Sequence, residues 1–193
     1  MRLFVALDID SAIRERIARF LDGVREFAPD ARWVHAESLH LPLKFIGEQP
    51  DRKLDAIKQA LAAIHSPATN LSFQGYGFFP TPRSARVFWV GVEADEHLAR
   101  LAGLVEQALK PLGIQAEDRV FSPHLTLARG KSAAPQRRAD DRPNRAFQHL
   151  QEKLSALPPP EFGTMTAREF FLYQSKLSPA GSQYTRLQGF ILT

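Results

Sequence analysis

HLPL at residues 40–43 and HLTL at residues 124–127 are the two most informative stretches of the chain. Each lies inside a run in which apolar side chains alternate with other residues, a pattern typical of a β-strand that is buried on one face. Residues two apart in a strand share a face, so His124 and Thr126 are expected to project together while the leucines beside them enter the core. The second stretch therefore predicts a strand that presents an imidazole and a hydroxyl to a cleft.

The first stretch follows the same parity, with one exception to the usual strand chemistry. His40, Pro42 and Lys44 are expected on one face, and Phe45 is expected with the leucines on the other. Proline lacks the N–H that a central strand uses in its ladder, so Pro42 conflicts with a central position.

Two imidazoles that face one another suit the cleavage of a phosphodiester. One neutral ring takes a proton from the nucleophile while the other, protonated, gives one to the leaving oxygen; histidine titrates at about pH 6.5, so both forms coexist at neutral pH. Thr126 can donate to a nonbridging phosphate oxygen, and Arg129 can balance charge on the equatorial oxygens. Arg129 breaks strand parity with His124, so a strand end or a bulge, which the following Gly130 favours, has to bring it to the cleft.

Metal binding is the rival use of histidine. No carboxylate is placed beside either histidine stretch, so the sequence predicts no metal site and no cofactor. The remaining histidines lack the framing of the two stretches and are expected at the surface or in loops: His35, His65, His97 and His149.

The composition bounds the class of protein. The 193 residues, 44% of them hydrophobic, suffice for one domain or two small fused lobes with a sizeable core. The absence of cysteine excludes disulfides and cysteine nucleophiles and favours a reducing compartment, so we expect a cytoplasmic protein. The net charge of +4 leans mildly toward phosphate-bearing partners. The short apolar run at residues 3–7 fits neither a signal peptide nor a membrane span.

Hydrophobic periodicity and turn residues predict a mixture of helices and strands. We expect strands at residues 3–7, 32–34, 39–46, 71–78, 85–92, 120–128 and 166–173 and near Phe190, and helices at about 11–28, 51–64, 96–109 and 147–157. Two sections share the order strand, helix, histidine strand, and the pair 71–78 and 85–92 reads as an antiparallel hairpin. The sequence therefore predicts a duplicated α+β architecture rather than a doubly wound fold.

Ordered blocks over nearly the whole chain resemble the 2H phosphoesterase superfamily, and specifically the RNA 2′,3′-cyclic phosphodiesterases, also called 2′-5′ RNA ligases. The blocks are RLFVALD at 2–8, WVHAESLHLPLKFIGE at 33–48, FFPTPRSARVFWVGV at 78–92, FSPHLTLAR at 121–129 and LYQSKLSPAGSQYTRLQGF at 172–190. The resemblance implies two pseudo-symmetric lobes, each an antiparallel sheet backed by helices, with a central active-site cleft. It implies one duplicated domain over residues 1–193, in which the stretch at about 130–145 is expected to be a mobile basic loop.

The resemblance also implies a reaction. The expected substrate is RNA or a nucleotide ending in a 2′,3′-cyclic phosphate, opened by water to a 2′-phosphate. By resemblance His40 is the general acid and His124 the general base, roles that the sequence alone does not assign, and Thr126 and Arg129 match the family's threonine and phosphate-binding arginine. We expect no membrane, no obligatory protein partner and a monomer.

One position departs from the family, which has threonine where Pro42 stands. Losing one donor to the phosphate would cost about 10² to 10³ in rate if nothing replaces it. Lys44 could supply a substitute cation on the same face, and the plainer interpretation is a surface-adjacent lysine. Phe4 is our first candidate for stacking a base, with Tyr76, Phe78 and Trp89 as further ones, although strand aromatics mostly pack inward.

Two alternatives to hydrolysis stay open. Ligation of RNA ends through a 2′-5′ bond is the reverse reaction. An RNA-end binding module whose chemistry is weakened at Pro42 belongs to a different class of function.

Overall fold

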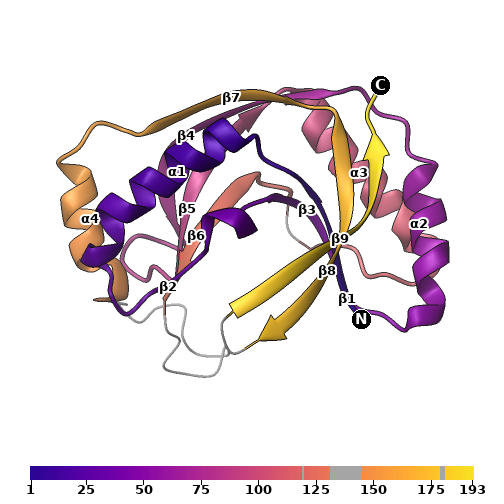
Figure 1. Cartoon of the computed structure of the whole chain (residues 1–193), viewed down its shortest axis with the longest axis horizontal. Helices are drawn as coiled ribbons and strands as arrows, with labels where there is room; N and C mark the ends of the chain where they lie inside the picture. The colour runs from indigo at the N-terminus through magenta and orange to yellow at the C-terminus, as the bar shows by residue number, and fades with distance from the viewer. Residues whose placement is uncertain (119, 131–144, 179–180) are drawn as a thin grey trace.

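The computed structural model of the chain has two antiparallel β-sheets with helices packed against them (Figure 1). It describes residues 1–118, 120–130, 145–178 and 181–193. The loop predicted at about 130–145 lies, apart from its end residues, outside these described residues. The predicted α+β fold class is confirmed.

The four-stranded sheet carries the first histidine stretch. Its strands lie in the order β3 (Leu41–Glu48), β1 (Arg2–Leu7), β8 (Glu169–Ser178) and β9 (Gly181–Ile191), and all neighbours are antiparallel. β3 is therefore an edge strand, and edge strands tolerate proline because one of their sides makes no ladder hydrogen bonds. The edge position removes the conflict between Pro42 and a strand.

The five-stranded sheet carries the second histidine stretch. Its strands lie in the order β2 (Arg32–Trp33), β6 (His124–Arg129), β5 (Val87–Ala94), β4 (Thr69–Phe79) and β7 (Glu161–Ala167), again antiparallel throughout. β4 and β5 pair as the hairpin that the turn residues between them predict.

The helices are α1 (Ser11–Val24), α2 (Leu54–Ala62), α3 (Glu96–Leu109) and α4 (Gln148–Ser155), with 3₁₀ turns η1 (Arg25–Phe27), η2 (Ala36–Ser38), η3 (Asp51–Lys53), η4 (Lys110–Leu112) and η5 (Arg145–Phe147). α3 starts where the Asp95 side chain accepts a hydrogen bond from the backbone N–H of His97, at 3.2 Å. α1 contacts β7 and η2, whereas α3 contacts β3 and β4. Within the described ranges, no helix is long and apolar enough to cross a membrane.

The hydrophobic core joins the helices to one face of each sheet. Helix positions that recur every three or four residues, such as Ile13, Ile17 and Leu21 of α1, are fully enclosed. A second, small cluster lies apart from this core and consists of Phe4, Ala6, Phe171 and Tyr173, which we call the aromatic face of the four-stranded sheet. The two clusters show that both faces of this sheet are covered by apolar side chains.

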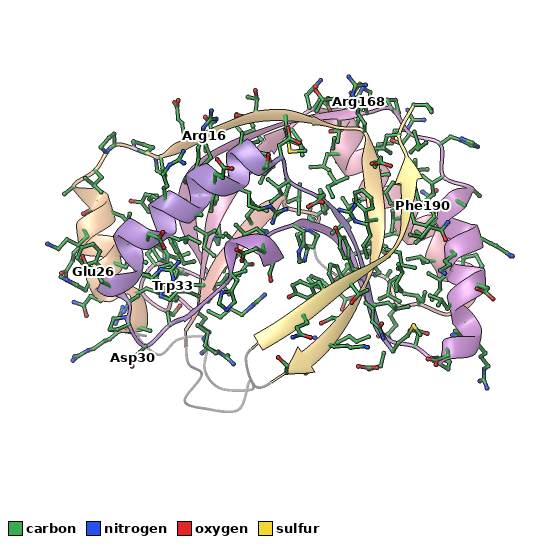
Figure 2. All side chains as sticks on the ribbon, in the orientation of Figure 1. Arg16, Glu26, Asp30, Trp33, Arg168 and Phe190 are labelled. Atoms are coloured by element: carbon green, nitrogen blue, oxygen red, sulfur yellow. The ribbon has the colours of Figure 1, made fainter. Side chains whose placement is uncertain are left out.

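Several strand boundaries differ from the sequence prediction; β9, for example, begins at Gly181, well before the strand predicted near Phe190. The strand predicted at 166–173 is the end of β7 joined to the start of β8, because the chain passes from one sheet to the other at Arg168 (Figure 2). The strand predicted at 120–128 begins only at His124, since the residues before it have no strand partner.

Candidate active site

His124 is the first residue of β6 and lies opposite Gly91 of β5. Its Nδ1 lies 2.7 Å from the backbone oxygen of Ser122. A carbonyl oxygen can only accept, so Nδ1 donates, and in the neutral ring Nε2 keeps its lone pair. The half-buried ring packs edge-on against Phe79 and Trp89, at centroid distances of 5.1 and 6.2 Å. The imidazole is therefore fixed in one orientation with its basic nitrogen available.

His40 lies directly before β3, against the aromatic face. Its ring stacks on Phe4 at 4.7 Å and on Tyr173 at 5.7 Å, and Tyr184 meets it edge-on at 4.8 Å. It also makes a hydrogen bond with the backbone of Ser38. Aromatic rings thus surround this imidazole on several sides.

Burial has a strong effect on the charge of His40. Desolvation of the imidazolium, together with a smaller effect of the nearby Arg14, lowers the pKa of His40 to about 4. The hydrogen bond with Ser38 and the carboxylate of Asp8 raise the pKa, but by less than burial lowers it. His40 is consequently neutral at pH 7 in the unliganded protein.

Arg129 reaches the face of His124 through a β-bulge. Thr126 pairs with Trp89 of β5, but the next pair joins Ala128 to Phe88, so Leu127 is an extra residue in β6. The extra residue shifts the parity by one, and Arg129 pairs with Val87, which shares a face with Trp89. The bulge required by the sequence analysis is present, and the exposed Arg129 lies on the same face as Thr126.

The first stretch contains a bulge at the corresponding residue. Pro42 pairs with Ala6 of the aromatic face, whereas Lys44 pairs with Val5, so Leu43 is the extra residue. Lys44 therefore points to the opposite face from Pro42, against expectation. Phe45 pairs with Phe4, lies on the aromatic face instead of in the core, and is 57% exposed.

Lys44 forms an ion pair with Glu106 and a hydrogen bond with the backbone of Gln115. Its ammonium group is buried and lies 2.7 Å from Glu106 Oε1 and 2.6 Å from the backbone oxygen of Gln115. It cannot replace the missing threonine hydroxyl from there, because its charge is paired and faces α3. The expectation of a substitute cation at Lys44 is corrected accordingly.

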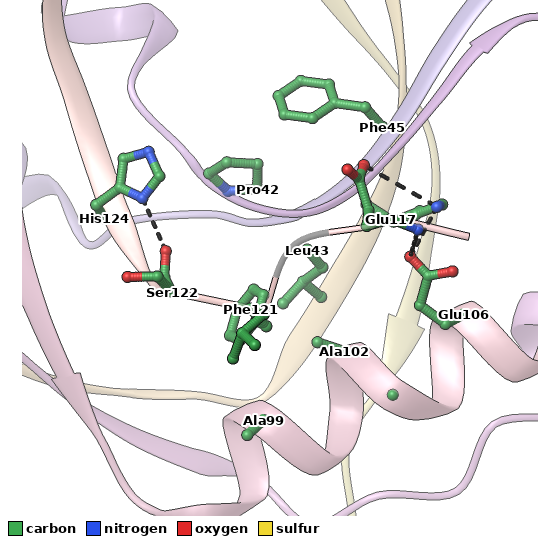
Figure 3. A pocket seen from close by; sticks show the side chains of 13 residues that line it. Pro42, Leu43, Phe45, Ala99, Ala102, Glu106, Glu117, Phe121, Ser122 and His124 are labelled. Atoms are coloured by element: carbon green, nitrogen blue, oxygen red, sulfur yellow. Dashed lines mark hydrogen bonds and ion pairs between the residues drawn. The ribbon is translucent and has the colours of Figure 1, made fainter. Parts of the chain in front are cut away.

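A cavity of about 310 Å³ opens beside His124 and Pro42 (Figure 3). Its other lining residues are mostly apolar, Phe45 and Phe121 among them, with small residues on the side of α3. The carboxylates of Glu106 and Glu117 lie at its far end from His124 (Figure 3). Because Pro42 belongs to the four-stranded sheet and His124 to the five-stranded sheet, this cavity marks where the two histidine stretches face each other.

A second cavity of about 260 Å³ lies beside His40. Tyr173 and Tyr184 line it together with the charged side chains of Asp8, Arg14, Glu37 and Arg186. One Asp8 oxygen accepts a hydrogen bond from Arg14 at 2.7 Å, and the other accepts one from Arg186. His40 thus borders a cluster of paired charges.

The four aromatic residues predicted as candidates for base stacking differ in how far their side chains are exposed. Phe4 is 3% exposed and lies beneath His40, so it supports the imidazole and offers no free face to a base. Phe78 is buried and stacks on the core residue Phe88. Tyr76 packs edge-on against the same Phe88 ring. Trp89 is half-buried and stacks on Phe79 at 5.0 Å, beside His124.

Several site residues escaped the sequence analysis, among them Arg14, Tyr173, Tyr184 and Arg186, which reach His40 from distant segments. One local signal was available. Serine stands two residues before each histidine, at Ser38 and Ser122, and both imidazoles hydrogen-bond to the backbone of that serine. The repeated Ser-x-His-Leu-x-Leu pattern therefore marks a shared local geometry.

These features define a class of site: one oriented imidazole at the start of β6 and one directly before β3, each beside a cavity, with a threonine and an arginine on the face of His124. In the part of the chain that the structure describes, no three His, Asp or Glu side chains are grouped to hold a metal ion. The metal-free mechanism stays a prediction.

Comparison with known proteins assigns the family. The family described as LigT like Phosphoesterase matches the chain over residues 7–89 and again over 90–184. The chain belongs to this phosphoesterase family. It is 37% identical to the RNA 2′,3′-cyclic phosphodiesterase of Archaeoglobus fulgidus over 98% of the chain and 99% of that protein, and 32% identical to that of Methanothermobacter thermautotrophicus over 100% and 99%. The crystal structure of Escherichia coli LigT complexed with 3′-AMP superimposes with a TM-score of 0.78 at 30% identity, covering 100% of this chain and 98% of that one.

Proposed function

We propose that the protein hydrolyses RNA or nucleotide 2′,3′-cyclic phosphates to the 2′-phosphate, with His40 and His124 as the acid–base pair. The observation that carries this proposal is the matched hydrogen bonding of the two imidazoles, each of which bonds to the backbone of the serine two residues upstream. The relatives' activity and the 3′-AMP bound to E. coli LigT support a nucleotide substrate.

The reaction needs two proton transfers. One imidazole takes a proton from water as the water oxygen attacks phosphorus, and the bond from phosphorus to the 3′ oxygen breaks. The other imidazolium donates a proton to that 3′ oxygen, leaving the phosphate on the 2′ oxygen. Thr126 and Arg129 donate hydrogen bonds to the nonbridging oxygens, where negative charge accumulates.

The roles of the two histidines follow the family in this proposal. His124, with Nδ1 bonded to Ser122, accepts the proton of water at Nε2. His40 donates to the leaving 3′ oxygen, and the negative charge of the bound phosphate supplies the proton affinity that burial removes.

The rest of the nucleotide has room in the cleft. The exposed ring of Phe45 offers an aromatic face, and bases of any identity stack on such faces. The cavity that His124 and Phe45 line together is where we expect part of the substrate to bind. Pro42 supplies no hydroxyl there, so Thr126 is the motif's one remaining hydroxyl.

The test is hydrolysis of nucleoside 2′,3′-cyclic phosphates in the presence of EDTA, with product identity read by chromatography. We expect the 2′-phosphate as sole product and loss of most activity in His40→Ala and in His124→Ala. His65→Ala, which removes an exposed histidine elsewhere, is the matched control. Undiminished turnover in both site variants would discard the proposal, and loss of activity in EDTA would discard its metal-free mechanism.

Ligation is the second candidate, because the same site can run the reaction in reverse with a 5′-hydroxyl in place of water. An assay with excess 5′-hydroxyl RNA and a cyclic-phosphate end, in which the 2′-5′ linked product is quantified, separates the two directions.

A binding module with weakened chemistry is the third candidate, motivated by Pro42. Pro42→Thr separates it from an enzyme: a rate increase of orders of magnitude at constant RNA affinity would make the natural protein a degenerate enzyme. We favour activity, because both imidazoles and Arg129 are in place. The cytoplasmic location and the monomeric state stay predictions; size-exclusion chromatography with light scattering tests the latter.

A further inference from the structure

The backbone at His40 is not held by the sheet. His124 is itself a member of β6 and pairs with Gly91, whereas β3 begins one residue after His40, where Leu41 pairs with Leu7. The residues before His40 form the turn η2 and a single extended residue, Leu39. A catalytic side chain in such a place needs another anchor, because a misplacement of about 1 Å can cost about 10²-fold in rate.

Arg14 of α1 supplies four hydrogen bonds at this place. Its Nη1 donates to the backbone oxygens of Ala36 and Leu39, at 2.7 and 2.9 Å. Its Nη2 donates to Asp8 Oδ1 at 2.7 Å and to the backbone oxygen of Ile9 at 3.3 Å. The first two acceptors lie at the start of η2 and at the residue directly before His40, so one rigid guanidinium fixes both ends of the segment that leads to the imidazole.

The same guanidinium connects to the ring environment of His40. Asp8, which Arg14 binds through one oxygen, binds Arg186 of β9 through the other. Arg186 in turn donates a hydrogen bond to the hydroxyl of Tyr173, on which the His40 ring stacks. Arg14 therefore acts directly on the backbone that leads to His40, and on one stacking partner of the ring through two further side chains.

We propose that Arg14 is a positioning residue for His40 in the reaction. The proposal rests on the proposed function, in which His40 transfers a proton. It depends on the planar fork of arginine, because lysine offers one compact ammonium group that cannot reach the same set of oxygens at once.

The experiment compares Arg14→Met with Arg16→Met. Arg16, labelled in Figure 2, lies on the same helix and also donates to a backbone oxygen, that of Phe162 in β7 at 2.9 Å. This hydrogen bond goes to the five-stranded sheet and not to the segment before His40. We expect Arg14→Met to lower kcat for a nucleoside 2′,3′-cyclic phosphate by about 10²-fold with a much smaller change in KM. Arg16→Met is expected to keep the kcat of the natural protein. The kcat of Arg14→Lys is expected to lie between those of Arg14→Met and the natural protein.

A second readout separates positioning from general support of the fold. The charge of Arg14 lowers the pKa of His40, while Asp8 raises it; Tyr173, Tyr184, Glu37 and Arg186 also border the same cavity. NMR titration of the His40 imidazole is expected to show a higher pKa in Arg14→Met and no change in Arg16→Met. This measurement needs no turnover, so it tests the anchor even if the natural protein fails to hydrolyse cyclic phosphates, an outcome that would count against the proposed function alone.

Equal kcat in Arg14→Met and Arg16→Met would overturn the proposal. So would a lowered kcat with an unchanged titration of His40, because the loss would then come from elsewhere. If Arg14→Met melts below the assay temperature, the same two measurements are made on Arg14→Lys. An unchanged kcat together with an unchanged His40 titration in that variant overturns the proposal. A lowered kcat with a shifted titration supports it.

Discussion

Binding of a nucleotide 2′-phosphate should restore the proton affinity of His40. Burial lowers the pKa of His40 to about 4, roughly 2.5 below the usual 6.5, which corresponds to about 3.4 kcal/mol. One negative charge about 4 Å away, in an effective dielectric constant of about 20, stabilises the imidazolium by about 4 kcal/mol. This gain equals about 3 pH units, so we expect the pKa of His40 to be about 7 in the complex.

The assay is an NMR titration of histidine-labelled protein, with and without a saturating nucleotide 2′-phosphate, and with the uncharged nucleoside as control. His40→Gln removes the His40 signal and so assigns it among the six histidines of the chain. Kinetics give an independent measure, since kcat/KM reports the free enzyme and kcat the complex. The limb of the kcat profile that belongs to His40 should therefore lie about 3 pH units above the His40 limb of the kcat/KM profile.

The opposite result has a definite meaning. If His40 still titrates near pH 4 in the complex, only about one ring in a thousand is protonated at pH 7, and the His40 limbs of kcat and kcat/KM coincide. That outcome would refute the electrostatic reasoning and favour His40 as the base.

Three further predictions concern stability and the cavity. Because the pKa of His40 is lower in the folded than in the unfolded protein, its contribution to the free energy of unfolding is fully present above pH 6.5. As the pH falls toward 4, this contribution is lost, by up to about 3 kcal/mol. In urea unfolding, His40→Gln should therefore lose less stability between pH 7 and pH 4 than the natural protein. Lys44→Met should lower the free energy of unfolding in urea by about 3 kcal/mol, because it leaves Glu106 without its buried partner. The double variant Lys44→Met/Glu106→Gln should recover part of this loss. An equal loss in the single and the double variant would contradict the pairing of the two side chains. Gly103→Leu should keep or raise the melting temperature, since a Cβ there meets nothing within 4 Å, yet lower kcat/KM by filling the cavity beside His124; unchanged kinetics would show that substrate does not enter this cavity.

The sequence predicted the α+β class and the two histidine strands because alternation, helical periodicity and turn residues are local signals. It placed Thr126 on the face of His124 correctly by parity. It failed at Lys44 and Phe45, because the extra residue at Leu43 exchanges the two faces of the strand. A bulge depends on which residues of the neighbouring strand pair, and that register is not encoded in the bulged strand alone.

The surroundings of His40 were beyond local reasoning for a related cause. Tyr173 and Tyr184 come from β8 and β9, more than a hundred residues further along the chain. Arg14 looked like an ordinary residue of the polar side of an amphipathic helix. The four oxygens it binds come together only when the end of β1 and the turn before β3 meet beside α1.

The matching bulges at Leu43 and Leu127 put Phe45 and Arg129 at corresponding positions of the two histidine strands. If the two histidine strands offered the same groups, a nucleotide would bind in either of two opposite directions with similar ease. An aromatic ring at one position and a cation at its counterpart remove that ambiguity, because a base prefers the ring and an anion prefers the cation. We therefore expect the cleft to impose a single polarity on an incoming RNA end.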